Sequence, residues 1–476
     1  MSLHAKSKKI VLCALFLLTH ISLNGSDGFL DIEIHSPFFD IIMSKLDNHP
    51  VELLQHTLQK SEPKKDWTLL LYIAADNDLA PFSIRNIRQM ARIGSNNYIN
   101  IVVQLDVKKA SGKKITRRFL IQKGKVLHLN ADDPSSQSMD SGNPKTLISF
   151  CKWGIETFPS NHVALVLWNH GTGALDPERG RIVRGEELFL FNQISQRLEL
   201  DRTIGYIDRI LDRGICWDDS TGNFLSNARL NYALSEICTK HLDGKKLDFI
   251  GFDACLMQMV EVAHAVKQYA HTMVGSQEVE LGYGWNYADV LEPFTKGTMT
   301  PQAFVTHIVQ SFGKTYEKIT NDYTLSALNL GLLHFVEKNI EDIALLLIDG
   351  LKNQKKRTVT NMIRASRSNR SCTHFDEPTY IDLHDFYTNL IKNSNSIQLQ
   401  NRSEETQYKK NLVNLLKEGQ KSIERMTIAN ITGKNLSRAR GVSIYFPEQW
   451  IHYSYQKLSF VNETSWFDLV KQYMMS

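Results

Sequence analysis

Two side chains with complementary chemistry stand at the ends of apolar segments of this chain. His170 follows the run "VALVLWN" and precedes "GTG", and Cys255 follows the run "LDFIGFDA". An imidazole can accept the proton of a thiol, and the thiolate that results is a strong nucleophile. Glycines beside the histidine let a ligand approach the backbone because they carry no Cβ. The pair therefore favours nucleophilic catalysis by Cys255 with His170 as its base.

Each of these residues also has a purely structural interpretation. A cysteine in an apolar run is most often a small buried side chain. A histidine beside Asn and Gly is common in turns, and the aspartates Asp76 and Asp106, which end two other apolar runs, can cap helices. What favours the catalytic interpretation is that His170 and Cys255 stand at equivalent ends of two similar runs.

The elements that must position these residues are predicted from four almost continuous apolar runs. Runs of this kind are typical of strands buried on both faces of a sheet. They cover residues 67–76, 99–107, 163–171 and 247–255. Between them lie amphipathic stretches with helical spacing, at residues 81–94, 143–158 and 226–242.

Alternating strands and helices predict an α/β fold with a largely parallel sheet. In such sheets ligands bind at the carboxyl ends of the strands, so Asp76, Asp106, His170 and Cys255 should share one rim. Helical spacing resumes in "LMQMVEVAHAV" directly after Cys255. We therefore expect its sulfur near a helix N-terminus, where the helix dipole favours the thiolate.

The N-terminus has the pattern of an export signal. Three lysines precede nine apolar residues, 10–18, and a polar stretch follows. This is the order of a secretory signal peptide, and the apolar run is too short to span a bilayer comfortably. We predict a signal peptide over residues 1–25 and a short helical leader or propeptide over 26–66, so the protein is expected to be exported.

Composition excludes several classes of protein. The 55 basic and 51 acidic side chains give a formal charge of +4, with no basic stripe for nucleic acid. No other stretch reaches transmembrane length, so no membrane span is expected in the mature chain. Six cysteines without a CxxC pair exclude a zinc ribbon or a disulfide scaffold. Removal of Cys13 with the signal peptide leaves an odd number, which indicates a free thiol.

Residues 67–300 are predicted to form the core, and residues 301–476 a mostly helical C-terminal subdomain packed on it. Two segments there, 324–333 and 441–447, are apolar enough to add strands to the sheet, and residues 333–352 and 408–426 are amphipathic helices. The aromatic side chains at the end of the chain, from Trp450 to Tyr473, are predicted to pack in the protein core. The alternative is that they form a platform for a ligand.

Several stretches together resemble the clostripain family of cysteine peptidases, whose fold is related to those of caspases, gingipains and legumains. They are "YIAADNDL", "LVLWNHGTG", "GICWDDSTGNFLSNARL", "DFIGFDACLM", "GSQEVELGYGWNYADVL" and the end of the chain. The resemblance runs from about Trp67 to the last residues and implies a caspase-like α/β/α sandwich. One departure is "ARL", where the family usually has an acidic residue before the leucine.

The resemblance implies a role for each site residue. His170 would be the general base and acid, Cys255 the nucleophile, and the backbone N–H groups of Gly171 and Cys255 the oxyanion hole. Asp253 would line the S1 pocket and select a basic P1 side chain, Arg and also Lys, because a buried carboxylate pairs well with a guanidinium. The alternative for Asp253 is a strand-end cap.

The resemblance also implies a zymogen that is cut between the His and Cys blocks. Residues 176–214 form a charged insert with seven arginines, of which Arg179, Arg181 and Arg184 are candidate processing sites. The alternative is a solvated charged hairpin. Either a monomer or a processed two-chain form is expected.

Calcium is the cofactor that the resemblance implies, although the chemistry itself requires none. The segments "DNDL" and "WDDSTGN" offer the oxygen ligands that calcium takes, but neither matches an EF-hand, and both also suit turns and caps. A zinc site at His162, His170 and Cys255 fails because no further ligand recurs at sensible spacing.

The sequence thus predicts an exported cysteine endopeptidase that cleaves after basic residues through a Cys–His dyad and an acyl-thioester. Two alternatives stay open: a catalytically silent protein that binds peptides or a partner on the same rim, and an acyl transferase or peptide ligase that uses the same two residues.

Overall fold

The computed structural model describes residues 52–55, 63–109, 111–129, 138–176, 189–192, 197–200, 214–352 and 356–476. All of them belong to one compact unit, Ile32–Ser476. The predicted signal peptide, most of the predicted leader, and Arg179, Arg181 and Arg184 lie outside the described residues.

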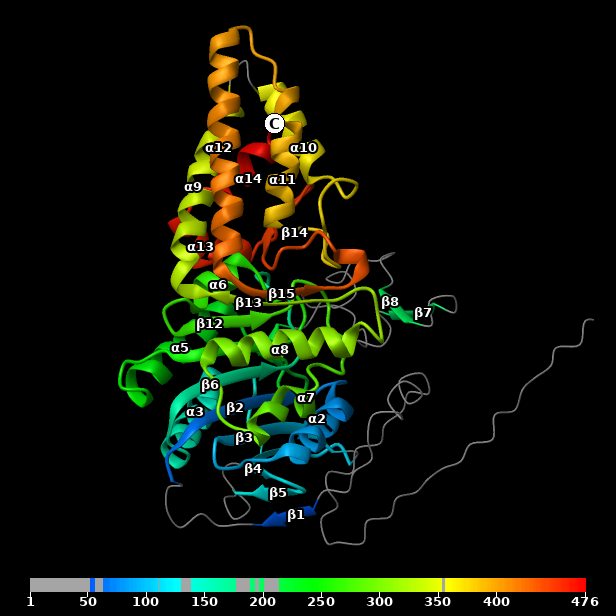
Figure 1. Cartoon of the computed structure of the whole chain (residues 1–476), viewed down its shortest axis with the longest axis vertical. Helices are drawn as coiled ribbons and strands as arrows, with labels where there is room; N and C mark the ends of the chain where they lie inside the picture. Colours follow the sequence, from blue (N-terminus) through cyan, green and yellow to red (C-terminus); the bar gives the residue numbers. More distant parts are fainter. Residues whose placement is uncertain are drawn as a thin grey trace, which may run out of the picture. The chain divides into compact units, whose positions relative to one another are not determined.

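A ten-stranded sheet forms the centre of this unit (Figure 1). In order across the sheet, its strands are β1 (Glu52–Gln55), β5 (Lys125–His128), β4 (Lys114–Gln122), β3 (Ile99–Lys108), β2 (Lys65–Ala75), β6 (Ser160–Trp168), β11 (Leu247–Asp253), β12 (Ala270–Gly275), β13 (Thr324–Asn329) and β15 (Thr427–Thr432). The strands from β3 to β12 run parallel to one another, and β4, β13 and β15 add antiparallel pairings on the two sides. The predicted mixed α/β class with a largely parallel core is therefore confirmed.

The four apolar runs of the sequence are the four central strands β3, β2, β6 and β11. Their side chains are almost all buried, and the core around Trp67, Tyr72 and Trp168 is closed to solvent. Burial on both faces is what removes the alternating pattern from their sequences.

Helices cover both faces of the sheet, and the chain order explains which face each one takes. The β2–β3 crossover moves across the sheet in one direction, and the crossovers to β6, β11 and β12 move in the other. Because such crossovers are right-handed, the two directions place their helices on opposite faces. One group is α2 (Ala80–Ile93), with α7 (Tyr287–Leu291) and α8 (Pro301–Tyr316); the other is α3 (Pro144–Thr157), α5 (Asn227–His241) and α6 (Val260–Val266).

The C-terminal region adds a group of helices beyond β12, β13 and β15 (Figure 1). These are α9 (Leu333–Gly350), α10 (Lys356–Arg367), α11 (Leu383–Asn393), α12 (Arg402–Met426), α13 (Ser459–Glu463) and α14 (Trp466–Met474). Helix α9 packs on α12 and α14, and α11 packs on α10 and α12. Within the aromatic-rich end Tyr455, Phe460 and Trp466 are buried, as the packing interpretation predicted, whereas Trp450 and Tyr453 are exposed.

Two predictions about elements were wrong, and one strand of the sheet was not predicted. Residues 52–55, predicted as helical leader, form the edge strand β1 and pair with β5, because pairing to an open sheet edge overrides local helical spacing. The segment 441–447 does not extend the main sheet: β16 (Ser443–Tyr445) pairs with β14 (Tyr380–Asp382) in a separate ribbon. The strand that does extend the sheet is β15, which joins the predicted strand β13.

Two short ribbons complete the described chain. Strands β9 (Ile215–Asp218) and β10 (Asn223–Leu225) pair beside the rim of the main sheet. Strands β7 (Phe189–Asn192) and β8 (Arg197–Leu200) form an antiparallel hairpin in the charged insert. Leu198 and Leu200 of this hairpin are buried, and the pairing does not decide between a structural and a processing role for the insert.

Candidate active site

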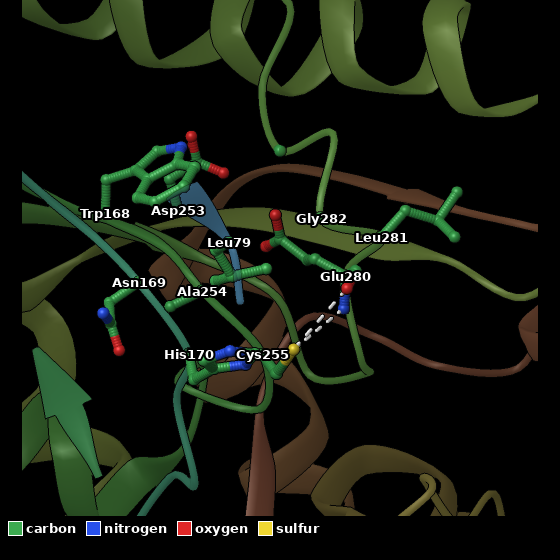
Figure 2. Close-up of a pocket in the computed structure, with 11 residues that line it drawn as sticks. Leu79, Trp168, Asn169, His170, Asp253, Ala254, Cys255, Glu280, Leu281 and Gly282 are labelled. Atoms are coloured by element: carbon green, nitrogen blue, oxygen red, sulfur yellow. Dashed lines mark hydrogen bonds between the residues drawn. The ribbon is translucent and has the colours of Figure 1, made fainter. Parts of the chain in front are cut away.

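The register of β6 and β11 brings the two predicted catalytic residues to the same level. Trp168 is paired with Asp253 at the ends of these neighbouring parallel strands, and the N–H of Asn169 donates to the Asp253 carbonyl at 3.3 Å. His170 and Cys255 each lie two residues beyond this last pair. Both line one cavity at the rim of the sheet (Figure 2).

His170 is buried and is held by a carboxylate of the segment "DNDL", which the sequence suggested only as a source of calcium ligands. Its Nε2 lies 2.8 Å from Oδ1 of Asp78, in the turn between β2 and α2. A carboxylate accepts hydrogen bonds, so Nε2 carries the proton. In the neutral ring Nδ1 is then the nitrogen that can accept a proton.

The turn that carries Asp78 is itself fixed. The Asn77 side chain donates to the carbonyls of Ala74 and Trp217, at 3.1 and 3.2 Å, and its Oδ1 accepts the N–H of Leu79 at 3.0 Å. Asn77 therefore ties the turn to β2 and to β9, and it limits the positions that Asp78 can take.

Cys255 is buried and its sulfur contacts the backbone of Glu280. The N–H of Glu280 donates to Sγ at 3.3 Å, and Sγ–H donates to the Glu280 carbonyl at 3.6 Å. The expected helix N-terminus is not directly behind the sulfur. Leu256 has φ +62°, outside the helical region, and α6 begins only at Val260. The thiol therefore meets the backbone of Glu280 and not the N-terminus of a helix.

Gly171 lies against the backbone of Cys255. A Cβ at position 171 would come within 2.4 Å of the Cys255 carbonyl oxygen and 2.9 Å of the Met257 sulfur. Only glycine fits this approach, so the two residues named for the oxyanion hole are neighbours in space.

Asp253 is a buried carboxyl group in the wall of the cavity. It accepts the N–H of Trp285, at 3.1 Å to Oδ1, and the hydroxyl of Tyr287, at 2.8 Å to Oδ2. Burial raises the pKa of Asp253 to about 7, despite these two donors. It does not serve as a strand-end cap, which was the alternative interpretation, because its donors come from a segment more than 30 positions away in the sequence.

Glu280 is a second buried carboxyl group in this cavity, and sequence reasoning missed it. Neither of its carboxyl oxygens receives a hydrogen bond from any described residue. Burial, and then the charge of Asp253, raise the pKa of Glu280 well above its usual value. Figure 2 shows its carboxyl group turned toward the side of the cavity where Asp253 lies. The sequence carried one signal, an isolated acidic residue in the otherwise apolar and glycine-rich stretch "VELGYGW".

The cavity between these groups is small. Its free volume is about 30 Å³, and its walls are formed by residues 168–170, 253–255 and 280–284 together with Leu79. A water molecule needs roughly 10–15 Å³ of such space, so the cavity has room for a few waters but not for a long basic side chain. The site is closed in this conformation.

The two segments considered for calcium do meet in space, beside β2 and β3. Asp76 comes from "DNDL", Asp218 comes from "WDDSTGN", and Asp106 of β3 lies with them. However, the ammonium group of Lys114 stands among the three carboxylates, 3.0 Å from Asp106 and 3.5 Å from Asp76, and it also bonds Asp218. The donor set suits a calcium ion, but a lysine already occupies its centre, so the residues of this chain do not fit the ion.

Other parts of the described chain offer no metal site either. In the part of the chain that the structure describes, no group of three or more His, Cys, Asp or Glu side chains could hold a metal ion. His162 lies at the opposite end of β6 from His170 and pairs with Asp248 at 2.8 Å, so the rejected zinc set is scattered. Over the same described ranges, no helix is both long enough and apolar enough to cross a membrane.

Comparison with known proteins connects this geometry to one family. The sequence pattern of the clostripain family matches residues 71–186 and 201–473. Clostripain of Hathewaya histolytica is 23% identical over 403 residues, which are 73% of this chain and 70% of that protein.

Two solved structures share the fold. One is a secreted C11 cysteine protease from Bacteroides thetaiotaomicron in complex with an irreversible peptide inhibitor, with 17% identity and a TM-score of 0.53. The other is an inactive zymogen C11 protease from Parabacteroides distasonis, with 19% identity and a TM-score of 0.53. Each comparison covers 85% of this chain and 99% of the other.

Proposed function

This chain belongs to the clostripain family of cysteine peptidases, and from that premise we propose that it hydrolyses peptide bonds after basic residues, with Cys255 as nucleophile and His170 as base. The observation that carries the proposal is the level register of β6 and β11. Because these strands end at the same level, His170 and Cys255 line one cavity together with two buried carboxyl groups.

The reaction would use each group in turn. Nδ1 of His170 takes the proton of the Cys255 thiol, and the thiolate attacks the carbonyl carbon of the scissile bond. The N–H groups of Gly171 and Cys255 stabilise the oxyanion that forms. When the C–N bond breaks, His170 returns its proton to the leaving amine, and an acyl-thioester remains on Cys255. Water, deprotonated by His170, then releases the acid and restores the thiol.

Asp78 would complete the pair as a third residue. Its carboxylate holds the tautomer of His170 that leaves Nδ1 to face the chemistry, and it stabilises the imidazolium during each transfer. Because it acts through His170, its role is that of a positioning residue.

Specificity for a basic P1 residue would come from two carboxyl groups and not from Asp253 alone. Burial raises the pKa of Asp253, and burial together with the charge of Asp253 raises the pKa of Glu280, so the empty pocket retains a proton near neutral pH. A guanidinium could replace that proton and donate to Glu280 the hydrogen bonds that its carboxyl oxygens lack. The planar fork of arginine can reach two carboxylates at once, which favours Arg over Lys.

The closed cavity supports synthesis as a zymogen. Substrate entry requires the segment 276–284 to move away from Cys255, because its backbone contacts the sulfur and its side chains fill the pocket. Cleavage after Arg179, Arg181 or Arg184 would be the trigger. The export signal at residues 1–25 and the secreted relative support release of the protein from the cytoplasm.

The test is hydrolysis of peptides that end in a fluorogenic group after Arg, Lys or Ala. We expect turnover in the order Arg, Lys and then Ala, abolished by a thiol alkylator and by Cys255→Ala. Cys372→Ala, which removes another buried free cysteine remote in sequence from the rim, should leave turnover unchanged and serves as the matched control.

The same assay separates the alternatives. Absence of turnover by the processed protein, together with binding of the peptides, would establish the silent binding protein instead. Joining of two peptides in place of hydrolysis, with the same dependence on Cys255, would establish the transferase or ligase.

A further inference from the structure

We propose that Lys114 is a built-in cation, which takes the place of a calcium ion in the carboxylate cluster beside the β2–α2 turn and thereby positions Asp78 and His170 without any metal. The cluster consists of Asp76, Asp106 and Asp218 around the Lys114 ammonium group. In this chain the cation is part of the protein, so activity does not depend on calcium at this place.

The contacts of Lys114 resemble the coordination of a bound ion. Its Nζ contacts one oxygen from each of three carboxylates that come from three separate elements: the end of β2, β3 and β9. The three carboxylates are 0–3% exposed and the lysine side chain is 9% exposed. One buried cation thus binds carboxylates from segments that are distant in the sequence, as a metal ion does in other proteins.

The oxygens around Lys114 exceed what one ammonium group can bind. Ser141 donates its hydroxyl to Asp106 and its N–H to Asp218, the latter at 2.9 Å. Oδ1 of Asp76 is buried and has no hydrogen-bond partner among the described residues. An ammonium has three protons, whereas calcium takes six to eight oxygens. The cluster therefore keeps a spare buried carboxylate oxygen, as a site built for a larger cation would.

Short links connect the cluster to the imidazole. Asp76 precedes Asn77 and Asp78 in one turn, and its carbonyl accepts the N–H of Asp219 at 2.9 Å. On the other side Trp217, next to Asp218, donates its N–H at 3.0 Å to the side chain of Asn169, the neighbour of His170. By holding Asp76 to Asp218, Lys114 fixes the segments that carry both Asp78 and Asn169.

An ordinary buried ion pair is the competing explanation, and Lys114→Ala distinguishes the two. The variant deletes the ammonium group and leaves three carboxylates around an opened space. If Lys114 stands in for a divalent ion, the variant should acquire a calcium site, with affinity in the range of extracellular modules, Kd on the order of 10⁻⁴–10⁻³ M. Magnesium should bind much less well, because it demands a tighter octahedron and gives up its water reluctantly.

The experiment compares the wild-type full chain, Lys114→Ala and Lys113→Ala, which removes the exposed neighbouring lysine. Calcium binding is measured by titration calorimetry and by the shift in Tm, and turnover is measured with chelator, calcium or magnesium. We expect the wild type and Lys113→Ala to be insensitive to all three additions. Lys114→Ala should lose roughly 10- to 100-fold in kcat with chelator, the scale of a mispositioned catalytic group, and recover with calcium only.

The turnover measurement rests on the proposed function, whereas the calorimetric and Tm measurements do not. A failure of the proposed function can therefore be distinguished from a failure of this inference. A wild-type protein that binds calcium at this cluster, or a folded Lys114→Ala that neither binds calcium nor gains Tm from it, would overturn the inference. If Lys114→Ala folds poorly in the presence of chelator, an increase of its Tm on addition of calcium would support the inference in the same way. Adding Asp106→Asn to Lys114→Ala should abolish the calcium effect, and persistence of that effect would place the ion elsewhere.

Discussion

At the scale of single residues, the carboxyl groups of the site have two kinds of partner, one basic and one acidic. Asp78 pairs with an imidazole, and Asp253 pairs with a second carboxyl group, Glu280. The first arrangement holds a ring in one tautomer. The second places two buried carboxyl groups in the wall of one cavity.

Asp78→Asn should lower kcat by about 10²- to 10⁴-fold and leave KM almost unchanged, because an amide can donate to Nε2 and favour the wrong tautomer of His170. The measurement is steady-state kinetics on the arginyl substrate. Asp248→Asn is the matched control: it removes the carboxylate of a similar pair, with His162 at 2.8 Å, at the other end of β6. A comparable loss of kcat in both variants would show that Asp78 acts through general stability and not through His170.

The Asp253–Glu280 pair predicts a pH dependence with a definite sign. Its carboxyl groups hold a proton in the folded protein up to about pH 7, whereas an unfolded Asp releases it near pH 4. The unfolded chain thus binds fewer protons between these values, so the free energy of unfolding falls as pH rises from about 4 to about 7. This contribution is present at low pH and is lost as pH rises through the folded pKa.

Asp253→Asn should flatten this part of the stability curve, and it should be more stable than the wild type by on the order of 2–4 kcal/mol above about pH 7. Urea unfolding over a pH series measures the effect. In the same variant kcat/KM for the arginyl peptide should collapse relative to the alanyl peptide. An unchanged ratio of the two substrates, or a stability curve parallel to that of the wild type, contradicts the assignment of Asp253 to the pocket.

At the scale of elements, the central strands were predictable and the segments between them were less so. The four runs are apolar on both faces because they lie in the middle of the sheet, and this pattern is local in the sequence. Strands β1 and β15 lie at the two edges and their placement depends on partners far along the chain, β5 and β13. Periodicity alone contains no information about such pairings.

The difference between a local pattern and a contact with a distant segment also explains which site residues the sequence predicted. His170 and Cys255 end predicted strands, so the topology rule for parallel sheets selects them. Asp78 lies in a turn and Glu280 in an irregular segment, and they reach the site only through contacts across 92 and 25 positions of sequence. Their roles become visible once the segments 76–79 and 276–284 are placed against the rim.

The segment 276–284 forms one wall of the pocket. Gly284 has φ +61°, and a Cβ there would lie 2.6 Å from Oδ1 of Asp253. Gly284→Ala should cost about 1–3 kcal/mol of stability, the scale for a non-glycine residue in the left-handed region, and raise KM for the arginyl substrate. Urea unfolding and steady-state kinetics measure both effects. Gly297→Ala, where a Cβ meets no atom within 4 Å, is the control, and equal behaviour of the two variants would exclude a role for the backbone at 284.

At the scale of the whole molecule, the charged insert divides the chain between two neighbouring strands of one sheet. β6 precedes the insert and β11 follows it, and these strands are paired from Phe249–Ala164 to Asp253–Trp168. The ion pairs of Lys114 with Asp218 and the bonds of Trp217 with Asn169 also cross this division. A cut within the insert would therefore leave both fragments bound by the centre of the sheet.

Processing should accordingly produce a two-chain protein that stays together. We expect two fragments on a denaturing gel, a single peak of unchanged mass by size-exclusion chromatography, and a new N-terminus after Arg179, Arg181 or Arg184. Cys255→Ala should remain one chain when purified alone and be cut at the same bond when active enzyme is added. The triple variant Arg179→Ala, Arg181→Ala and Arg184→Ala should resist cutting there and stay inactive, because the segment 276–284 keeps its hold on Cys255. Full activity of this variant as an uncut chain would mean that the pocket opens without cleavage, and separation of the fragments under native conditions would mean that the β6–β11 pairing does not hold the cut protein together.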